Sequence, residues 1–241
     1  MKNFGILACL VFATGLIARA DNVPTLTVDC GADCMAISLT SEGNNVWGIA
    51  SPTTYTLANG ASFTLNNVTL DMDPSVHYAI GVTNADGATG FTPYTFTFTT
   101  PTTLAAGLYS VSSSLAGSLT DGESNGVTLQ PVSGAVQQAF IGTADAGVDL
   151  LNTAISQGPT PTTQIFGPFT ANSTANVASP VSQISVTTSF QLSDDDSASL
   201  SGRFDVNAVP EPSSLPMAFV AAGAFGVLLV RAHRSRLESA A

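Results

Sequence analysis

The chain has 241 residues, of which 44% are hydrophobic and only 10% are charged. Between residues 21 and 209 there are fifteen acidic residues and one basic residue, Arg203, so this part carries a net side-chain charge of −14. Such a charge repels phosphate backbones and anionic lipid surfaces, which argues against nucleic-acid binding and leaves divalent cations as the natural small partners. The same charge also keeps a surface soluble without any partner.

The first twenty residues have the pattern of a secretory signal peptide. Lys2 supplies the positive start, and residues 4–18 form an apolar core that is too short to span a bilayer comfortably. Ala18 and Ala20 put small side chains at positions −3 and −1 of a cleavage site, so we expect signal peptidase to cut before Asp21. The rest of the chain is therefore predicted to be exported.

Two cysteines remain once Cys9 leaves with the leader. Cys30 and Cys34 stand in the sequence CGADC, and in an exported protein this spacing favours one small disulfide, with free thiols as the alternative. A zinc site would need two further ligands, and His77 is the only obvious one.

The exported part is rich in Thr, Ser, Ala, Gly and Val and alternates apolar with polar residues, which predicts strands. Many short strands separated by turn signals are typical of an antiparallel β-sandwich, which we expect over residues 21–207. A phase change at Asn66-Asn67 predicts a bulge or a tight turn. Strands are expected at residues 26–28, 35–39, 53–57, 62–72, 108–115, 127–132, 135–141 and 164–170.

Two longer strand pairs show the clearest alternation, and we interpret each as a hairpin with one buried face. The first covers residues 75–99, and the second covers residues 184–206 around the acidic loop 193–197. A short helix is a further expectation near residues 145–155. The proline-threonine segment 158–163 is interpreted as a long loop within one domain, with a boundary between two subdomains as the alternative.

Catalysis has few candidate residues in this chain. His77 is the only histidine before the C-terminal tail, its strand phase places it on the polar face, and no GxSxG nucleophile motif accompanies it. The part after the leader also contains no lysine, which removes Schiff-base chemistry. We therefore expect a protein that is not an enzyme.

The acidic loops are candidates for a cation. Asp194, Asp195 and Asp196 stand together in the loop of the second predicted hairpin, and calcium prefers several carboxylate oxygens. None of the acidic runs has the spacing of an EF-hand. The alternative is a solvated loop whose charges discourage edge-to-edge aggregation.

Trp47 is the only tryptophan. A single tryptophan on a sandwich is more often part of the core, and the alternative is an exposed ring that stacks on a sugar.

The C-terminal region contains a second apolar segment followed by basic residues. Residues 213–230 carry no charge and would form a helix of about 27 Å, close to the ~30 Å of a bilayer core. Arg231, Arg234 and Arg236 follow within the tail 231–241, which predicts a cytoplasmic end and a transmembrane helix with the sandwich outside.

The motif Val209-Pro210-Glu211-Pro212, followed by this apolar segment and the arginines, resembles the PEP-CTERM sorting tag of bacterial surface proteins. The resemblance covers residues 209–236, within a tag region of 208–241, and implies processing by an exosortase, a membrane-embedded transpeptidase-like enzyme. It implies an anchored precursor and a mature protein at the cell surface or in the extracellular matrix. The sandwich itself is expected to be a surface protein without catalytic activity or, alternatively, a polysaccharide-binding module, in which calcium could assist.

Overall fold

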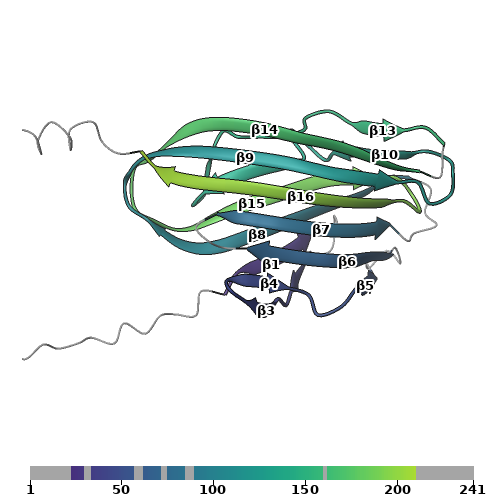
Figure 1. The fold of residues 1–241 in the computed structure, drawn as a ribbon, viewed down its shortest axis with the longest axis horizontal. Helices are drawn as coiled ribbons and strands as arrows, with labels where there is room; N and C mark the ends of the chain where they lie inside the picture. Colours follow the sequence, from purple (N-terminus) through teal and green to yellow (C-terminus); the bar gives the residue numbers. More distant parts are fainter. Residues whose placement is uncertain are drawn as a thin grey trace, which may run out of the picture.

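The computed structural model describes residues 23–29, 34–56, 62–71, 75–84, 90–159 and 162–209, and in these residues the only regular elements are strands. They form two antiparallel eight-stranded sheets that lie face to face (Figure 1). This confirms the predicted all-β antiparallel sandwich. Within these ranges, no helix has the length and apolar character that crossing a bilayer requires.

Several sequence predictions fall outside the described residues. They concern the signal peptide with Ala18, Ala20 and Asp21, the cysteine Cys30, and the sorting tag after Val209, including Pro210, Glu211, Pro212, Arg231, Arg234 and Arg236.

The first sheet, sheet 1, contains β1 (Thr25–Asp29), β2 (Cys34–Ile37), β8 (Thr92–Leu104), β10 (Val127–Pro131), β11 (Gln137–Ile141), β12 (Ala144–Asp145), β13 (Ile155–Gln157) and β15 (Val181–Leu192). The second, sheet 2, contains β3 (Thr40–Gly43), β4 (Val46–Gly48), β5 (Thr53–Thr56), β6 (Ser62–Asp71), β7 (Val76–Asn84), β9 (Gly107–Thr120), β14 (Thr163–Val177) and β16 (Ser197–Ala208).

The strand pairing is nested, as in one long hairpin that has been rolled up. β7 pairs with β16, β8 with β15, β9 with β14 and β10 with β13, and the tip of the hairpin is β11 with β12. Rolling brings β16 beside β9 and β15 beside β10 as well. This connectivity is that of a jelly roll. The N-terminal strands widen it, because β1 and β2 extend sheet 1 beyond β8 while β3 to β6 extend sheet 2 beyond β7.

Both predicted hairpins are wrong in their pairing, although their strands are real. β7 lies in sheet 2 and β8 in sheet 1, and β15 and β16 are likewise in opposite sheets. The chain therefore crosses between the sheets at each of these turns. Alternation determines which face of a strand is buried, but the buried face is the same whether the next strand continues the sheet or lies across from it.

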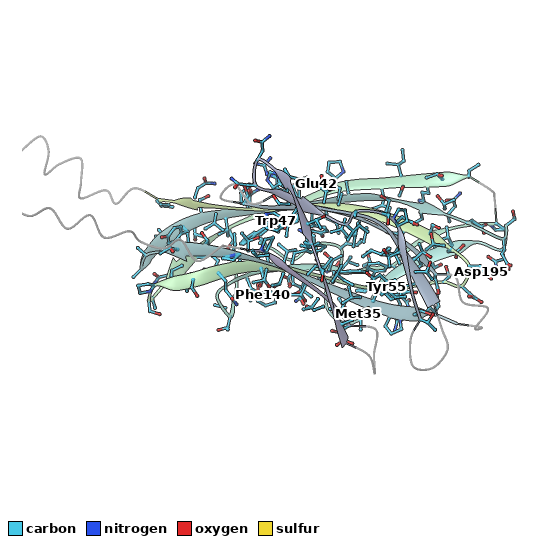
Figure 2. All side chains as sticks on the ribbon, turned by 90° about the horizontal axis from the view of Figure 1, so that it is seen from below. Met35, Glu42, Trp47, Tyr55, Phe140 and Asp195 are labelled. Carbon is cyan, nitrogen blue, oxygen red and sulfur yellow. The ribbon has the colours of Figure 1, made fainter. Side chains whose placement is uncertain are left out.

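The core lies between the two sheets and consists of one cluster of buried apolar residues (Figure 2). Every large apolar residue predicted to point inward in the two strand pairs is buried, from Val76 to Val206. Burial of one such side chain contributes about 1.5–3 kcal/mol. The predicted irregularity in β6 is also confirmed, since its register with β7 shifts between Leu65 and Asn67.

A chain of buried hydrogen bonds crosses this core between the sheets. The Thr188 hydroxyl donates to the Tyr78 hydroxyl (2.5 Å), which donates to Gln137 Oε1 (2.6 Å). Gln137 Nε2 then donates to Ser113 Oγ (2.5 Å). The four residues alternate between sheet 1 and sheet 2, so the network fixes how the sheets are aligned. Burial raises the pKa of Tyr78, whose ring also stacks on Phe98 with centroids 4.4 Å apart.

The helix expected near residues 145–155 is wrong. This segment contains the end of β12, a bridge between Leu150 and Gln137, and the start of β13. Gly147 (φ 68°) and Leu151 (φ 59°) adopt left-handed backbone conformations that interrupt a right-handed helix.

Candidate functional site on the outer face of sheet 2

A shallow groove of about 380 Å³ crosses the outer face of sheet 2. It lies over β7, β16 and β9, the middle of the sheet in Figure 1. Its side chains include Thr69, His77, Ala79, Ser114, Ser201 and Arg203. A second hollow of about 310 Å³ adjoins it, since both are lined by Ala116 and Ser201, and it extends to Ile165 on β14.

The register explains why the surface is hollow here. Ser201 stands beside Ala79 on one side and Ala116 on the other, so small side chains form one row across three strands. The neighbouring row contains the larger His77 and Arg203, which are paired directly across β7 and β16. The groove is therefore a floor of small residues bounded by longer ones.

Asp205 holds the polar end of this site together. Arg203 Nε donates to Asp205 Oδ2 (2.5 Å), and His77 Nε2 lies 3.4 Å from Asp205 Oδ1. The Ser112 hydroxyl donates to Asp205 Oδ2 (3.3 Å), and the Ser75 side chain is also hydrogen-bonded to Asp205. The carboxylate thus fixes the positions of the guanidinium and the imidazole.

The electrostatics of this end are close to neutral. Burial raises the pKa of Asp205, but hydrogen bonds from Arg203, Ser75 and His77, together with the Arg203 charge, outweigh it and hold the pKa below its usual value. Asp205 is consequently ionised at neutral pH and balances the charge of Arg203. In a chain part with a net charge of −14, the Arg203–Asp205 pair thus adds no net charge to this end of the groove.

The arrangement does not have the order of a nucleophilic triad. In such a triad the histidine stands between the nucleophile and the carboxylate. Here the Ser112 hydroxyl donates to the carboxylate directly, and Asp205 is the hydrogen-bond partner of His77 in the described residues. His77 is 37% exposed in its side chain, on the polar face as predicted.

Trp47 does not belong to this face. It pairs with Leu70 across β4 and β6, and directly opposed residues point to the same side of a sheet. Leu70 is buried in the core, so Trp47 points inward as well and is half-buried at the edge of the sandwich (Figure 2). This orientation keeps Trp47 off the outer face of sheet 2, and whether its ring belongs to the core or stacks on a sugar stays a prediction.

The acidic loops meet at one end of the sandwich, where Figure 2 labels Asp195. Asp196 is buried, accepts the backbone N–H of Gly122 (3.1 Å) and also accepts a short hydrogen bond from the Ser193 hydroxyl. Asp121 accepts the N–H groups of Asn125 (3.2 Å) and Gly126 (3.0 Å). Two of the aspartates in this cluster therefore anchor loops.

Burial raises the pKa of Asp196, and the nearby charges of Asp121 and Asp194 act in the same direction against its hydrogen bonds. Among the residues that the structure describes, no group of three or more His, Cys, Asp or Glu side chains is arranged to hold a metal. Calcium at Asp194, Asp195 and Asp196 stays a prediction.

The cysteine prediction also stays a prediction. Asp29 and Cys34 are opposed in the β1–β2 pair, so residues 30–33, which include Cys30, connect these two strands.

The polar end of the groove could not be predicted from the sequence. His77 and Asp205 are 128 positions apart, and only the pairing of β7 with β16 brings them together. One signal was available, because Arg203 is the only lysine or arginine between residues 21 and 209 and stands in the outward phase of its strand. A single basic residue in an otherwise acidic chain is a candidate for a binding site.

No protein-family model matches this chain, and no curated protein matches it. Among solved structures, the chain is similar to the carbohydrate-binding module TmCBM61 in complex with β-1,4-galactotriose, with 14% sequence identity and a TM-score of 0.23. The match covers 59% of this chain and 87% of that chain. A likeness of this size carries no argument about fold or ligand.

Proposed function

We propose that this chain is an exported, non-catalytic surface protein whose outer groove on sheet 2 binds polysaccharide. The observation that carries the proposal is the groove itself: a floor of serine and alanine beside a fixed Arg203–Asp205 pair. Serine hydroxyls both donate and accept, as sugar hydroxyls do. A guanidinium and a carboxylate that are already in position can bind neighbouring hydroxyls at a low cost in side-chain entropy.

The two ends of the groove suit different parts of a sugar. Arg203, His77 and Asp205 offer hydrogen bonds at one end. Ile165 is 82% exposed at the far side of the adjoining hollow and offers an apolar contact to the face of a sugar ring. A groove that is open along the surface suits a chain of sugars better than a single small molecule.

The surface location rests on the sequence of the two ends. The leader before Asp21 is the substrate for signal peptidase, and the tag beginning at Val209 is the substrate for an exosortase-like enzyme, with membrane anchoring through residues 213–230 before processing. Intact mass and N-terminal sequence of the native protein check this part. A product that still begins at Met1 in the cytosol would contradict it.

Binding is tested on a glycan array and with the extracellular polysaccharide of the producing organism. We expect Ser201→Trp to fill the groove and weaken binding by more than about tenfold, which corresponds to ~1.4 kcal/mol. Asn207→Trp is the matched control, because Asn207 is exposed on the same face of the same strand but beyond the groove. Arg203→Ala should also weaken binding, since it removes one of the fixed donors.

The result that would overturn the groove as the site is unchanged binding by Ser201→Trp. Absence of binding to any polysaccharide by the natural chain would overturn the proposed ligand class. Catalytic turnover of a bound saccharide would contradict the non-catalytic part.

A further inference from the structure

Strand β14 is a long edge strand without a charged residue, and its proline, Pro168, and its bulge both lie in its first half. It has fifteen residues and pairs only with β9 within the described part of the chain. Natural edge strands are usually short, charged or interrupted, because their unpaired N–H and C=O groups can pair with another chain. The edge strands β3 and β12 are short and contain Glu42 and Asp145 respectively.

The charge distribution points to this edge as the place where two copies can meet. None of the residues 150–193 is charged, although residues 21–209 carry −14 in total. Two copies of the chain repel each other through their net charge, and a strand without charged residues adds nothing to this repulsion. The one irregularity of β14 lies between Phe166 and Phe169, and residues 169–177 continue in regular register with β9.

Residues 169–177 are complementary to the same residues of a second copy when the two strands run antiparallel with Ser173 opposite Ser173. The pairs are then Phe169 with Val177, Thr170 with Asn176, Ala171 with Ala175, and Asn172 with Thr174. The odd-numbered residues of 169–177 are the more buried, inward ones and the even-numbered residues are exposed. Apolar and small side chains therefore meet on the inner face, and Asn meets Thr on the outer face, where amide–hydroxyl hydrogen bonds are available.

The inner side of the edge has apolar surface that a second strand would cover. Phe169, Ala171 and Ala175 are only partly buried, although they pack against the core. β12 and the turn after it lie nearby but do not pair with β14, and a cavity of about 510 Å³ lies between residues 143–147 and residues 173–177.

We propose that the chain forms a symmetric dimer in which β14 pairs with β14 of a second copy, antiparallel and centred on Ser173. Sheet 2 then continues from one copy into the other. Because the two-fold axis is perpendicular to the sheet, the outer faces of both copies lie on the same side. The dimer does not depend on what the groove binds, but it would present two grooves on one surface.

This register can be tested by introducing charges at two of its paired positions in the full chain. Sedimentation velocity in mild detergent, over a range of protein concentrations, measures how much dimer forms. In Asn172→Lys/Thr174→Lys, each lysine lies opposite a lysine of the partner, and we expect the dimer to weaken by more than about tenfold. In Asn172→Lys/Thr174→Glu, each lysine lies opposite a glutamate, and the dimer should persist. The double-lysine variant also lowers the net negative charge, so general repulsion alone would predict the opposite result.

Circular dichroism is used to check that both variants are folded, which we expect because both positions are exposed. A natural chain that stays monomeric up to its solubility limit would overturn the proposal. A dimer that persists equally in the double-lysine variant would place the interface elsewhere. Loss of the dimer in both variants would overturn the register centred on Ser173.

Discussion

Two aspartates have pKa values shifted in opposite directions, and the hydrogen bonds around them explain why. Asp205 gains hydrogen bonds from Arg203, Ser75 and His77 that outweigh its burial and lower its pKa. Asp196 is more deeply buried and lies near Asp121 and Asp194, and its pKa is raised. Ionised Asp205 therefore contributes stability above its ordinary pKa of 3.8, and this contribution is lost as the pH falls through the lowered value.

Asp196 has the opposite effect on stability. Its ionised form costs free energy in the folded state at neutral pH, and the cost disappears as the pH falls through its raised pKa. Asp196→Asn should remove the cost while keeping an acceptor for the Gly122 N–H. The Ser193 hydroxyl can then donate to Thr128 O, 3.3 Å away, and accept from the new amide. We expect a higher melting temperature than the natural chain at pH 7 and no gain below pH 3.8.

Asp196→Ala is the control for this prediction. It leaves the Gly122 N–H without its acceptor, and we expect the free energy of unfolding to fall by about 1–3 kcal/mol. Thermal unfolding from pH 3 to pH 8 separates the two variants. Equal melting temperatures of Asp196→Asn and the natural chain across this range would contradict the buried-charge explanation.

At the scale of single residues, strand phase was the reliable signal. It placed His77 on the outer face, and the same alternation in residues 75–99 and 184–206 puts Tyr78 and Thr188 on the inner one, as the structure has them. It could not show that Thr188 and Tyr78 hydrogen-bond to each other, because they are 110 positions apart and in different sheets. Contacts of this kind depend on how the sheets are paired, which local alternation does not encode.

The strands of the two sheets differ in how firmly their backbones are held. β16 is paired along most of its length on both sides, with β7 and with β9. β3 is a four-residue edge strand whose residues are all exposed, and most of β5 is exposed as well. Free energies of local opening range from near zero at such edges to the global value in the core.

Hydrogen exchange should therefore follow this order. We expect peptides that cover residues 40–56 to exchange first and peptides from β9 and β16 to exchange last. Mass spectrometry of the native protein in deuterated buffer measures this directly. Uniform exchange rates along the chain would contradict the difference between edge and centre.

Among the elements, the existence of the long strands was predictable, whereas the short strands β3, β4, β12 and β13 and the partnership of all strands were not. β6 illustrates what was predictable, because its phase change at Asn66-Asn67 predicted the register shift between Leu65 and Asn67 that the structure has. The turn between β15 and β16 contains residues typical of a hairpin, yet the backbone N–H of Asn84 donates to Asp196 O (2.9 Å) and ties this turn to the end of β7. A turn that is stabilised by a distant strand cannot be recognised from its own residues.

The excess negative charge acts on the whole molecule. Residues 21–209 contain fifteen acidic residues and a single basic one, and several carboxylates meet at one end of the sandwich. Raising NaCl from about 10 mM to 150 mM shortens the Debye length from ~30 Å to ~8 Å, which weakens the repulsion between exposed charges. We expect the melting temperature to rise by about 2–4 °C, the equivalent of ~1 kcal/mol for a protein of this size.

Asp194→Asn/Asp195→Asn removes two of the charges from this end and should show a smaller rise. Sucrose at matched osmolality is the control for a general effect of the solute. A melting temperature that falls with salt would show that attractive ion pairs outweigh the repulsion.

β16 ends at Ala208 at the opposite end of the molecule from the acidic loops, after running between β7 and β9 (Figure 1). A pull on the chain beyond this point acts along the strand and stretches its lateral hydrogen bonds together rather than one after another. Such shear loading resists force far better than unzipping does. A protein held by its C-terminal end against flow or against a tensed matrix would thus be held through a strand that is hydrogen-bonded on both sides.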